Sequence, residues 1–590
     1  MVQEEKYNWN LQDLFKSESE FKKAKNEIED NLKKIGDYKG ILCDTAENLY
    51  NCYLIYEKTL ELFDKVYSYG MFKYHLDMAN QEGIKKFKEV ESIATEFETS
   101  TAFIVPEITY ADESKIYKFI EDYPNLKKYE RDIKDTLEKK KHILTKAEEE
   151  LLSKYSEVFS ASENTFDILT NAEFKFGEII KENGQSVQLT DATYTNFLKS
   201  QNESVRKQAF DLMYKKYSEY INTIAELYLS NVKTTAITSK IRKYNSSLER
   251  ATDKDDASIK VYEALMEGVN NTLNINHNFI SLKRELLKKN DFHMYDLYVN
   301  PFEEEKDEIT FEEAKKEVLD ALQVLGDEYV DKLKEAFNSR WIDVYEKPNK
   351  RGGAYSSGVY GVHPFVLMSF TSNKRDVSTI AHELGHSMHS YYSNKEQGII
   401  DAGYTIMVAE VASTVNEILL SEYQIKNEKN PVKKAEIIYE LLEMIRATFY
   451  RQSMFAEFEK IVHEKIENSE ILSSEDLNNI YYELNEKYFG ENIFIDQEIK
   501  YEWARIPHFY SDFYVYKYAT GISAAICIAT KILNREEGFV EKYISMLKQG
   551  RTKKSIDLLK MVDVDLESFD TYYRTAKYYE QKIADLKALL

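Results

Sequence analysis

The amino-acid sequence predicts a mainly α-helical protein that is too long for a single compact core. The 590 residues include only 19 glycines and seven prolines, and 31% of the residues are charged. Long segments repeat apolar residues at helical spacing, and few residues interrupt them. A chain of this length exceeds the size at which one hydrophobic core stops growing. We therefore expect an N-terminal helical domain over residues 1–200 and a second, larger domain over residues 201–590.

The expected helices follow one another with few interruptions. In the N-terminal part, residues 49–56 and 87–94 have helical apolar periodicity, and Pro106 and Pro124 mark breaks between helices. The acidic stretch at residues 303–308 is expected at the solvated surface. We find neither a low-complexity linker nor an internal repeat that would indicate a different architecture.

The composition argues against several classes of protein. The net charge is −23 and no basic block is interleaved with aromatic residues, so nucleic acid is not an expected partner. No apolar run of membrane-spanning length and no signal-like N-terminal segment occur, so we expect a cytoplasmic protein without a membrane partner. The cysteines, Cys43, Cys52 and Cys527, are odd in number and lack metal-binding spacing, which indicates reduced thiols.

One short motif carries most of the chemical information. In His382-Glu383-Leu384-Gly385-His386, two imidazoles lie four residues apart around a carboxylate. At about 3.6 residues per turn, both histidines lie on one helix face, where they can bind one zinc ion. Glu383 then flanks the position of a metal-bound water. The motif predicts a zinc peptidase.

The sequence around this motif indicates a helix that presents its histidines on the side opposite its core. Apolar residues from Val377 to Met388 fall on a stripe about 100° wide. His382, His386 and His389 fall on the other side, so a helix that docks through the stripe would present them to a cleft. The alternative is a surface helix with histidines placed by chance.

A catalytic zinc normally takes three protein ligands and keeps one position for water, so a third ligand is needed. His389 is one candidate, but on a straight helix it lies about 10.5 Å along the axis from His382. Glu410 is the other, on a second expected helix over residues 404–420. Because Gly398 and Gly403 bracket the connecting turn, that helix can pack back against the first.

We therefore assign Glu410 to the metal and keep His389 as an alternative or supporting residue. Glu417 lies seven residues after Glu410 on the same helix face. It is expected to orient a metal ligand from outside the ligand set, although a solvated surface carboxylate would also fit.

A second informative region precedes the metal helix. Four glycines occur within ten residues, from Gly352 to Gly361, in a chain that is otherwise poor in glycine. The apolar run at residues 365–370 that follows predicts a β-strand. The segment is a poor match to a phosphate-binding loop, because no Gly-Lys-Ser/Thr follows it. The loop could close over a peptide, or it could be a β-turn that leads into a core strand.

The combined motifs resemble the M3 metallopeptidases, the thimet oligopeptidase group, and most closely their bacterial oligoendopeptidase F branch. The resemblance rests on His382-Glu-x-x-His386, on Glu410-Val-Ala-Ser413 and on segments that occur in the family's order. These segments are His293 to Tyr298, Trp341 to Asp343, Arg351 to Tyr355 and His363 to Phe370. The match covers the chain from about residue 200 and is less distinctive before it.

The resemblance implies a helical body in two parts with a central substrate channel. It also implies a small β-sheet beside a zincin-type helix, with the 365–370 strand at the sheet edge. Extended peptides would bind that edge, and Gly353, Ala354 and Tyr355 are the residues expected to bind substrate.

The resemblance also assigns a role to the segment from Arg505 to Gly521. Peptide hydrolysis creates a tetrahedral oxyanion, and neutral donors such as histidine and tyrosine stabilise it. His508 matches the family's histidine most directly. The spacing of the tyrosines differs from the mammalian-type pattern, and the resemblance favours Tyr516, with Tyr514 as the alternative.

The sequence therefore predicts a zinc-dependent oligoendopeptidase that binds one Zn²⁺ ion and cleaves short unstructured peptides. A zinc-bound water would attack the peptide bond, with Glu383 as the general base. Two alternatives are a dipeptidyl carboxypeptidase of the same family and, from another class, a helical peptide-binding scaffold without activity. The intact Glu383 disfavours the scaffold. The sequence does not predict the oligomeric state.

Overall fold

The computed structural model describes residues 5–302 and 308–590 and confirms the prediction of a mainly α-helical fold. By internal contacts the chain divides into two units. The first comprises Met1–Ile143, Lys306–Tyr423 and Ile528–Asp563, and the second comprises Leu144–Glu305, Gln424–Cys527 and Val564–Leu590. The domain boundary expected at residue 200 does not coincide with this division and stays a prediction. The acidic stretch at 303–308 lies, apart from Glu308, outside the described residues.

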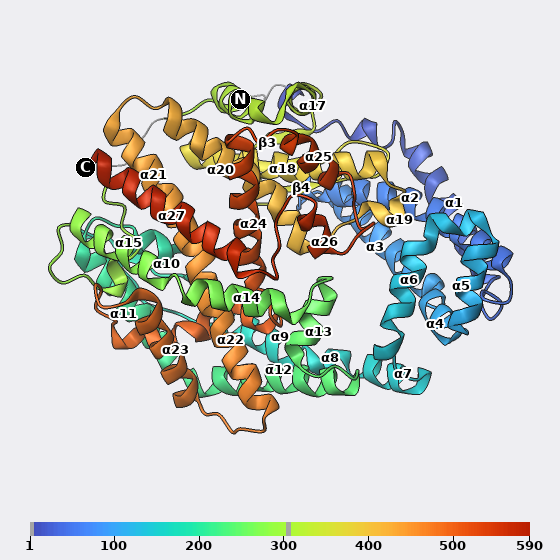
Figure 1. Cartoon of the computed structure of the whole chain (residues 1–590), viewed down its shortest axis with the longest axis horizontal. Helices are drawn as coiled ribbons and strands as arrows, with labels where there is room; N and C mark the ends of the chain where they lie inside the picture. Colours follow the sequence, from blue (N-terminus) through green and yellow to red (C-terminus); the bar gives the residue numbers. More distant parts are fainter. Residues whose placement is uncertain (1–4, 303–307) are drawn as a thin grey trace. The chain divides into compact units, whose positions relative to one another are not determined.

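The first unit contains a helical N-terminal part, the larger sheet and the two helices that carry the candidate metal ligands (Figure 1). Its helices are α1 (Glu18–Gly36), α2 (Ala46–Leu76), α3 (Gln81–Thr101), α4 (Ile104–Tyr110), α5 (Glu113–Asp122), α6 (Glu130–Glu138), α16 (Phe311–Leu322), α17 (Asp327–Asn338), α18 (Lys374–Glu396), α19 (Ile399–Ala402), α20 (Ile406–Asn427), α25 (Phe539–Leu547) and α26 (Ser555–Lys560). The last residues of α20 belong to the second unit.

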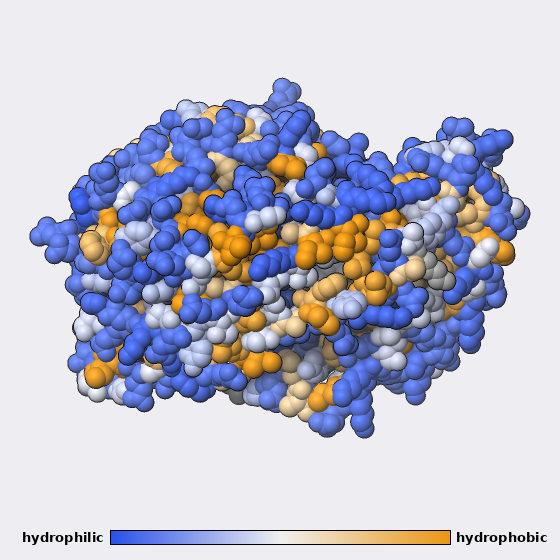
Figure 2. All heavy atoms as spheres, turned by 90° about the horizontal axis from the view of Figure 1, so that it is seen from below, coloured by the Kyte–Doolittle hydropathy of each residue, from blue (hydrophilic) through white to orange (hydrophobic). Residues whose placement is uncertain are grey.

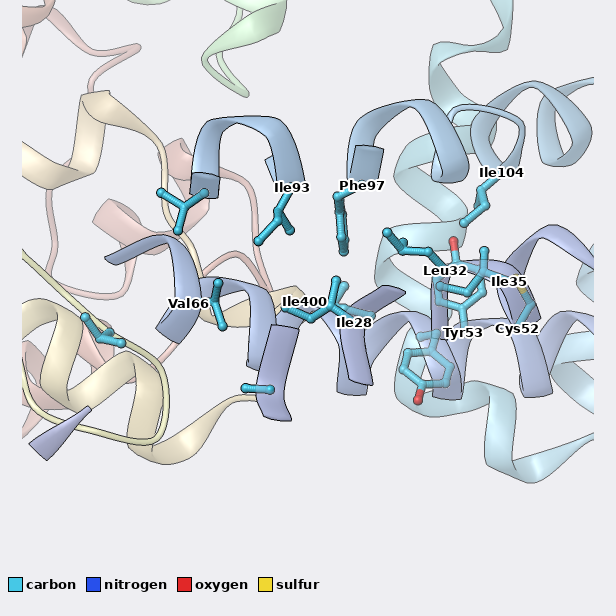
Figure 3. Close-up of a cluster of buried hydrophobic side chains, with 14 of the residues drawn as sticks. Ile28, Leu32, Ile35, Cys52, Tyr53, Val66, Ile93, Phe97, Ile104 and Ile400 are labelled. Carbon is cyan, nitrogen blue, oxygen red and sulfur yellow. The ribbon is translucent and has the colours of Figure 1, made fainter. Parts of the chain in front are cut away.

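Helices α1, α2 and α3 form because each has a polar cap and an apolar face. The side chains of Ser17, Thr45 and Asn80 accept hydrogen bonds from the first turns of these helices. Buried residues recur along α1 at helical spacing and pack against α2, α3 and α4 (Figure 3). The cluster extends to Ile400 in α19, the short helix between α18 and α20. The N-terminal helices thus support the connection between the two metal-site helices.

A three-stranded sheet stands next to the metal-site helices. Its order is β3 (Ile342–Tyr345), β5 (Phe365–Phe370), β4 (Tyr355–Ser357), with β3 parallel and β4 antiparallel to β5. The predicted strand at residues 365–370 is confirmed, and nearly all of its side chains are buried, as expected of a central strand. Its expected place at the sheet edge is wrong, because β4 pairs with its other side and forms the edge.

The N-terminal segment fastens this sheet. The indole nitrogen of Trp9 donates to the backbone carbonyls of Trp341 and Val366, at 2.9 and 2.8 Å. The ring of Trp9 is buried and contacts Phe72 of α2 and Phe365 of β5. The sheet is therefore held by helix α2 and by a segment more than 300 positions away in sequence.

The second unit is a helical body with one short hairpin, β1 (Glu178–Ile180) and β2 (Ser186–Gln188). Its helices are α7 (Lys146–Lys154), α8 (Ser156–Phe159), α9 (Ala161–Asp167), α10 (Asp191–Leu198), α11 (Glu203–Glu219), α12 (Ile221–Ile241), α13 (Ser247–Lys254), α14 (Ile259–Asn270), α15 (Leu273–Leu286), α21 (Pro431–Ile445), α22 (Gln452–Glu467), α23 (Ser474–Phe489), most of α24 (Tyr516–Leu533) and α27 (Phe569–Leu589). Buried rings join α12, α22 and the segment before α24: Tyr228, Phe458, Trp503 and Phe509.

Hydrophilic residues predominate on the face of the molecule drawn in Figure 2, in keeping with the high content of charged residues. Among the helices of residues 5–302 and 308–590, none combines the length and the apolar content that crossing a membrane requires.

Candidate metal centre

Helix α18 places the His-Glu-x-x-His motif. The helix begins after Asn373, which forms a capping box with Asp376. The predicted apolar stripe is buried: Val377, Ile380, Ala381, Leu384 and Met388. The side chains of His382 and His386, on the other side, remain 27% and 18% exposed. The predicted helix and the orientation of these two histidines are therefore confirmed.

Helix α20 brings the carboxylates. Gly398 and Gly403 cap the short helix α19, which returns the chain along α18, as the two glycines had indicated. The expected second helix begins at Ile406 and carries Glu410 and Glu417 on the side that faces the histidines. Figure 1 shows α18 and α20, yellow to orange, close to strands β3 and β4.

Three donor atoms converge at this point. The Nε2 atoms of His382 and His386 lie 3.2 Å apart, and an oxygen of Glu410 lies 3.6 Å from the first and 3.7 Å from the second. Metal bonds of 2.0–2.1 Å at tetrahedral angles separate ligand atoms by about 3.4 Å. The spacing therefore fits one tetrahedral metal ion with a fourth position left for water.

Hydrogen bonds from neighbouring residues hold the ligand side chains in place. Glu417 lies 3.1 Å from Nδ1 of His382 and can accept the proton of that nitrogen, which directs Nε2 toward the metal position. The backbone of Ala409 bonds the ring of His386, and the hydroxyl of Ser413 donates to Glu410 at 3.2 Å. Burial lowers the pKa of His382, but Glu417 outweighs this effect and the pKa rises to about 9.

Glu383 is positioned by the edge strand. Its side chain is buried, and the backbone N–H of Ser356 in β4 donates to its carboxylate. The hydroxyl of Ser387 donates to the backbone carbonyl of Glu383 and lies 2.8 Å from the hydroxyl of Ser356. Burial raises the pKa of Glu383 to about 7, and the neighbouring carboxylates add to the rise. A bound cation would act in the opposite direction.

His389 does not join this cluster. It is buried, its ring stacks on Tyr404 with centroids 3.6 Å apart, and its Nδ1 has no hydrogen-bond partner among the described residues. Burial and the neighbouring His386 lower its pKa to about 3. The expectation that His389 would face a cleft is wrong, because α19 and the start of α20 cover this end of α18.

Two residues that set the geometry escaped the sequence analysis. A Cβ atom on Gly385 would lie 2.6 Å from the backbone of Ala412 and of Ser413, so only glycine lets α18 and α20 approach this closely. The side-chain amide of Asn416 donates to the carbonyl of Ala381 and joins the two helices about one helical turn from this contact. A glycine inside a helix costs about 1 kcal/mol relative to alanine, which is the signal that could have revealed the contact.

The glycine-rich loop divides into a free part and a packed part. Gly353 is exposed with φ +85°, a Cβ there would meet nothing, and Ala354 is half-buried. Tyr355 begins the edge strand, and its hydroxyl lies 2.8 Å from Nδ1 of His75 on α2. Further on, a Cβ atom on Gly358 would lie 2.6 Å from Ser390 of α18, so that part of the loop is packed on the metal-site helix.

The residues expected to stabilise the oxyanion lie in the second unit. His508 is exposed, and the rings of Tyr514 and Tyr518 each lie 6.0 Å from it. Tyr516 is fully buried, and its hydroxyl donates to Asp255 at 2.8 Å. The structure therefore groups His508 with Tyr514 and Tyr518, and not with Tyr516.

Comparisons with known proteins agree with this site. A family model described as peptidase family M3 matches residues 196–578, and one described as oligopeptidase F matches residues 107–176. The chain is 39% identical to oligopeptidase PepF of Bacillus subtilis, over 99% of this chain and 87% of that protein. It is 35% identical to an oligoendopeptidase F homolog of Lactococcus lactis subsp. lactis, over 99% and 98% of the two chains.

The fold is also similar to that of a solved oligoendopeptidase structure. The crystal structure of oligoendopeptidase-F from Enterococcus faecium superposes with a TM-score of 0.75 at 30% identity, covering 97% of this chain and 99% of that one. A helical fold with a His-His-Glu cluster beside a buried carboxylate defines a metallopeptidase that acts on peptides. The chain belongs to peptidase family M3, which confirms the resemblance found in its sequence.

Replacing Gly385 by alanine should weaken metal binding at least about 10-fold, because the added methyl group forces α18 and α20 apart and separates the ligands. Metal content after dialysis against graded chelator measures the effect. Gly403→Ala is the matched control, since a Cβ at that position meets nothing within 4 Å. Equal metal retention in both variants would show that the helix contact does not set the ligand geometry.

Proposed function

We propose that the protein is a zinc oligoendopeptidase that hydrolyses internal bonds of short, unstructured peptides. The observation that carries the proposal is the convergence of His382, His386 and Glu410 on one point with tetrahedral spacing. Two nitrogens and one carboxylate oxygen with an open fourth position form a donor set typical of catalytic zinc. The names of the relatives, oligopeptidase and oligoendopeptidase, support peptide substrates of limited length.

Zinc held by these three residues would lower the pKa of a water molecule to about 7 and polarise the carbonyl of the bond to be cut. Glu383 takes a proton from the attacking water and passes it to the amine that leaves. Its burial favours this exchange because burial raises the pKa of the carboxyl group, which makes the carboxylate a stronger base. Glu417 keeps His382 in the tautomer that binds metal.

The edge strand β4 supports binding of an extended peptide. The backbone N–H of Ser356 in this strand donates to Glu383, so a peptide bound along the strand would pass beside the base. Gly353, Ala354 and Tyr355 precede Ser356 directly and are the residues that we propose to contact substrate.

For the oxyanion we propose His508 together with Tyr514 or Tyr518. The rings of these tyrosines are half-buried and lie beside His508, whereas the hydroxyl of Tyr516 is buried and donates to Asp255. Neutral donors of this kind stabilise negative charge that develops on the carbonyl oxygen. Burial lowers the pKa of His508, so its imidazole is neutral at pH 7 and keeps one N–H to donate. A cytoplasmic location remains our prediction from the sequence.

Peptides of graded length that are blocked at both ends test the proposal. We expect internal cleavage of the short members, complete loss of cleavage after chelation, and recovery when zinc is returned. Mass spectrometry of the products identifies each cut bond. Release of dipeptides from unblocked versions of these peptides, with no cleavage of the blocked ones, would favour the dipeptidyl carboxypeptidase. Binding of both versions without cleavage would favour the peptide-binding scaffold.

Replacing Glu383 by glutamine should retain the metal and lower kcat about 10²- to 10⁴-fold, since the amide cannot accept the proton of the attacking water. Metal analysis and peptide turnover measured on the same sample separate binding from chemistry. The control is Glu396→Gln, a change of the same kind in the last turn of α18 at a surface ion pair with Lys548. Turnover by Glu383→Gln near that of the wild type would remove Glu383 from the role of base.

Replacing Glu410 by alanine should abolish stoichiometric metal binding, because only two histidine ligands would remain. His389→Ala serves as its counterpart, since His389 is buried against Tyr404 and contributes no donor atom to the cluster. We expect one ion per chain in His389→Ala and a fraction of one in Glu410→Ala. The reverse pattern would assign the third ligand position to His389.

A further inference from the structure

The cluster formed by His508, Tyr514 and Tyr518 depends on a tight reversal of the chain. His508 lies in the short 3-10 helix η10 (Pro507–Tyr510), and Tyr518 lies in the first turn of α24. The five residues between these elements turn the chain back, so that the hydroxyl of Tyr518 lies 3.4 Å from Nε2 of His508. Tyr514 comes from the turn itself, with its ring 5.5 Å from that of Tyr518.

The turn contains an unfavourable backbone conformation. Phe513 has φ +54°, in the left-handed region that bulky side chains rarely occupy. Such a conformation persists only when surrounding contacts hold it, and it is found preferentially at functional sites. The contacts that hold Phe513 therefore determine where the cluster stands.

Helix α22 supplies two of these contacts. The carboxylate of Glu459 accepts the backbone N–H of Phe513. One helical turn later, the ring of His463 lies 4.5 Å from the ring of Phe513, which is itself buried. From helix α12, the hydroxyl of Thr235 donates to the carboxylate of Asp512 at 2.7 Å. The two residues at the centre of the turn are thus held by separate helices.

Glu459 is an unusual residue for this position. Its side chain is fully buried, and its second carboxylate oxygen has no hydrogen-bond partner among the described residues. Burial raises its pKa well above the usual range. An apolar residue would fill the same space without the cost of burying a polar group. The hydrogen bond to Phe513 is therefore what a carboxyl group adds here.

We propose that Glu459 is a positioning residue of the peptidase reaction, which fixes the Ser511–Val515 turn and so places His508, Tyr514 and Tyr518 side by side. It acts through its hydrogen bond to the Phe513 amide and does not touch substrate. This inference rests on the proposed function in one respect, namely that His508 and a neighbouring tyrosine act on the substrate.

Two substitutions at one position test the role. Glu459→Gln keeps a carbonyl oxygen that can accept the Phe513 N–H, whereas Glu459→Leu fills the space and removes the acceptor. We expect Glu459→Leu to lower kcat about 10- to 100-fold with unchanged metal content, and Glu459→Gln to remain near the wild type. Glu464→Leu, an exposed position on the same helix, is the matched control. Wild-type kcat in Glu459→Leu would overturn the proposal.

A double-mutant cycle separates positioning from a general loss of structure. If Glu459 acts through this cluster, adding Glu459→Leu to a His508→Ala enzyme should cause a smaller loss of kcat than it causes in the wild type, because one of the residues that it positions is already absent. Losses that multiply would overturn the positioning role. A His508→Ala enzyme as active as the wild type would remove His508 from the proposed function and this inference with it. If Glu459→Leu has the kcat of the wild type while His508→Ala is inactive, this inference is overturned and the proposed function is not affected.

A second variant covers the case in which Glu459→Leu does not fold, as judged by circular dichroism. Thr235→Val removes the hydroxyl that holds Asp512 and leaves the side-chain volume nearly unchanged. We expect a smaller decrease of kcat in the same direction, and a smaller one still in the His508→Ala background. Unchanged kcat in Thr235→Val would then count against a catalytic role for the position of this turn.

Discussion

The close contact between α18 and α20 is the constraint on which the metal centre depends. At Gly385 the backbones of the two helices approach so closely that even a methyl group would overlap Ala412 and Ser413. The histidines come from one helix and Glu410 from the other, so the distance between the helix axes sets the size of the site. About one helical turn away, the hydrogen bond from Asn416 to Ala381 also joins the two helices. A tetrahedral ligand set tolerates displacements of only a few tenths of an ångström.

The residues around the ligands also restrict the geometry of the site. Glu417, Ala409 and Ser413 each form a hydrogen bond with one of the metal ligands, and Ser356 forms one with the base. These partners come from α20 and from the edge strand β4. The sheet in turn is fastened by α2 and by the indole of Trp9. Hence α2 and the segment around Trp9, which supply neither a metal ligand nor the base, still help to orient the site.

Local patterns predicted several of these features correctly. The helix with its buried stripe, the turn capped by Gly398 and Gly403, and the strand at residues 365–370 all follow from interactions between near neighbours in sequence. The errors have a common cause. His389 was expected in a cleft and the 365–370 strand at an edge, yet each is covered by an element whose packing no local periodicity encodes. Local periodicity likewise did not predict that Tyr516 is buried and donates a hydrogen bond to Asp255.

The amino-acid sequence alone predicts the helical fold class, the resemblance to the family, and His382, Glu383, His386 and Glu410 as the candidate site residues. It could do so because spacing on a helix is a local property and because the order of motifs is characteristic of the family. Only the tertiary structure decided that three donor atoms meet at tetrahedral spacing, that Gly385 permits this, and which side chains remain accessible. These features depend on contacts between segments far apart in the chain, and burial and distance exist only once those segments have packed.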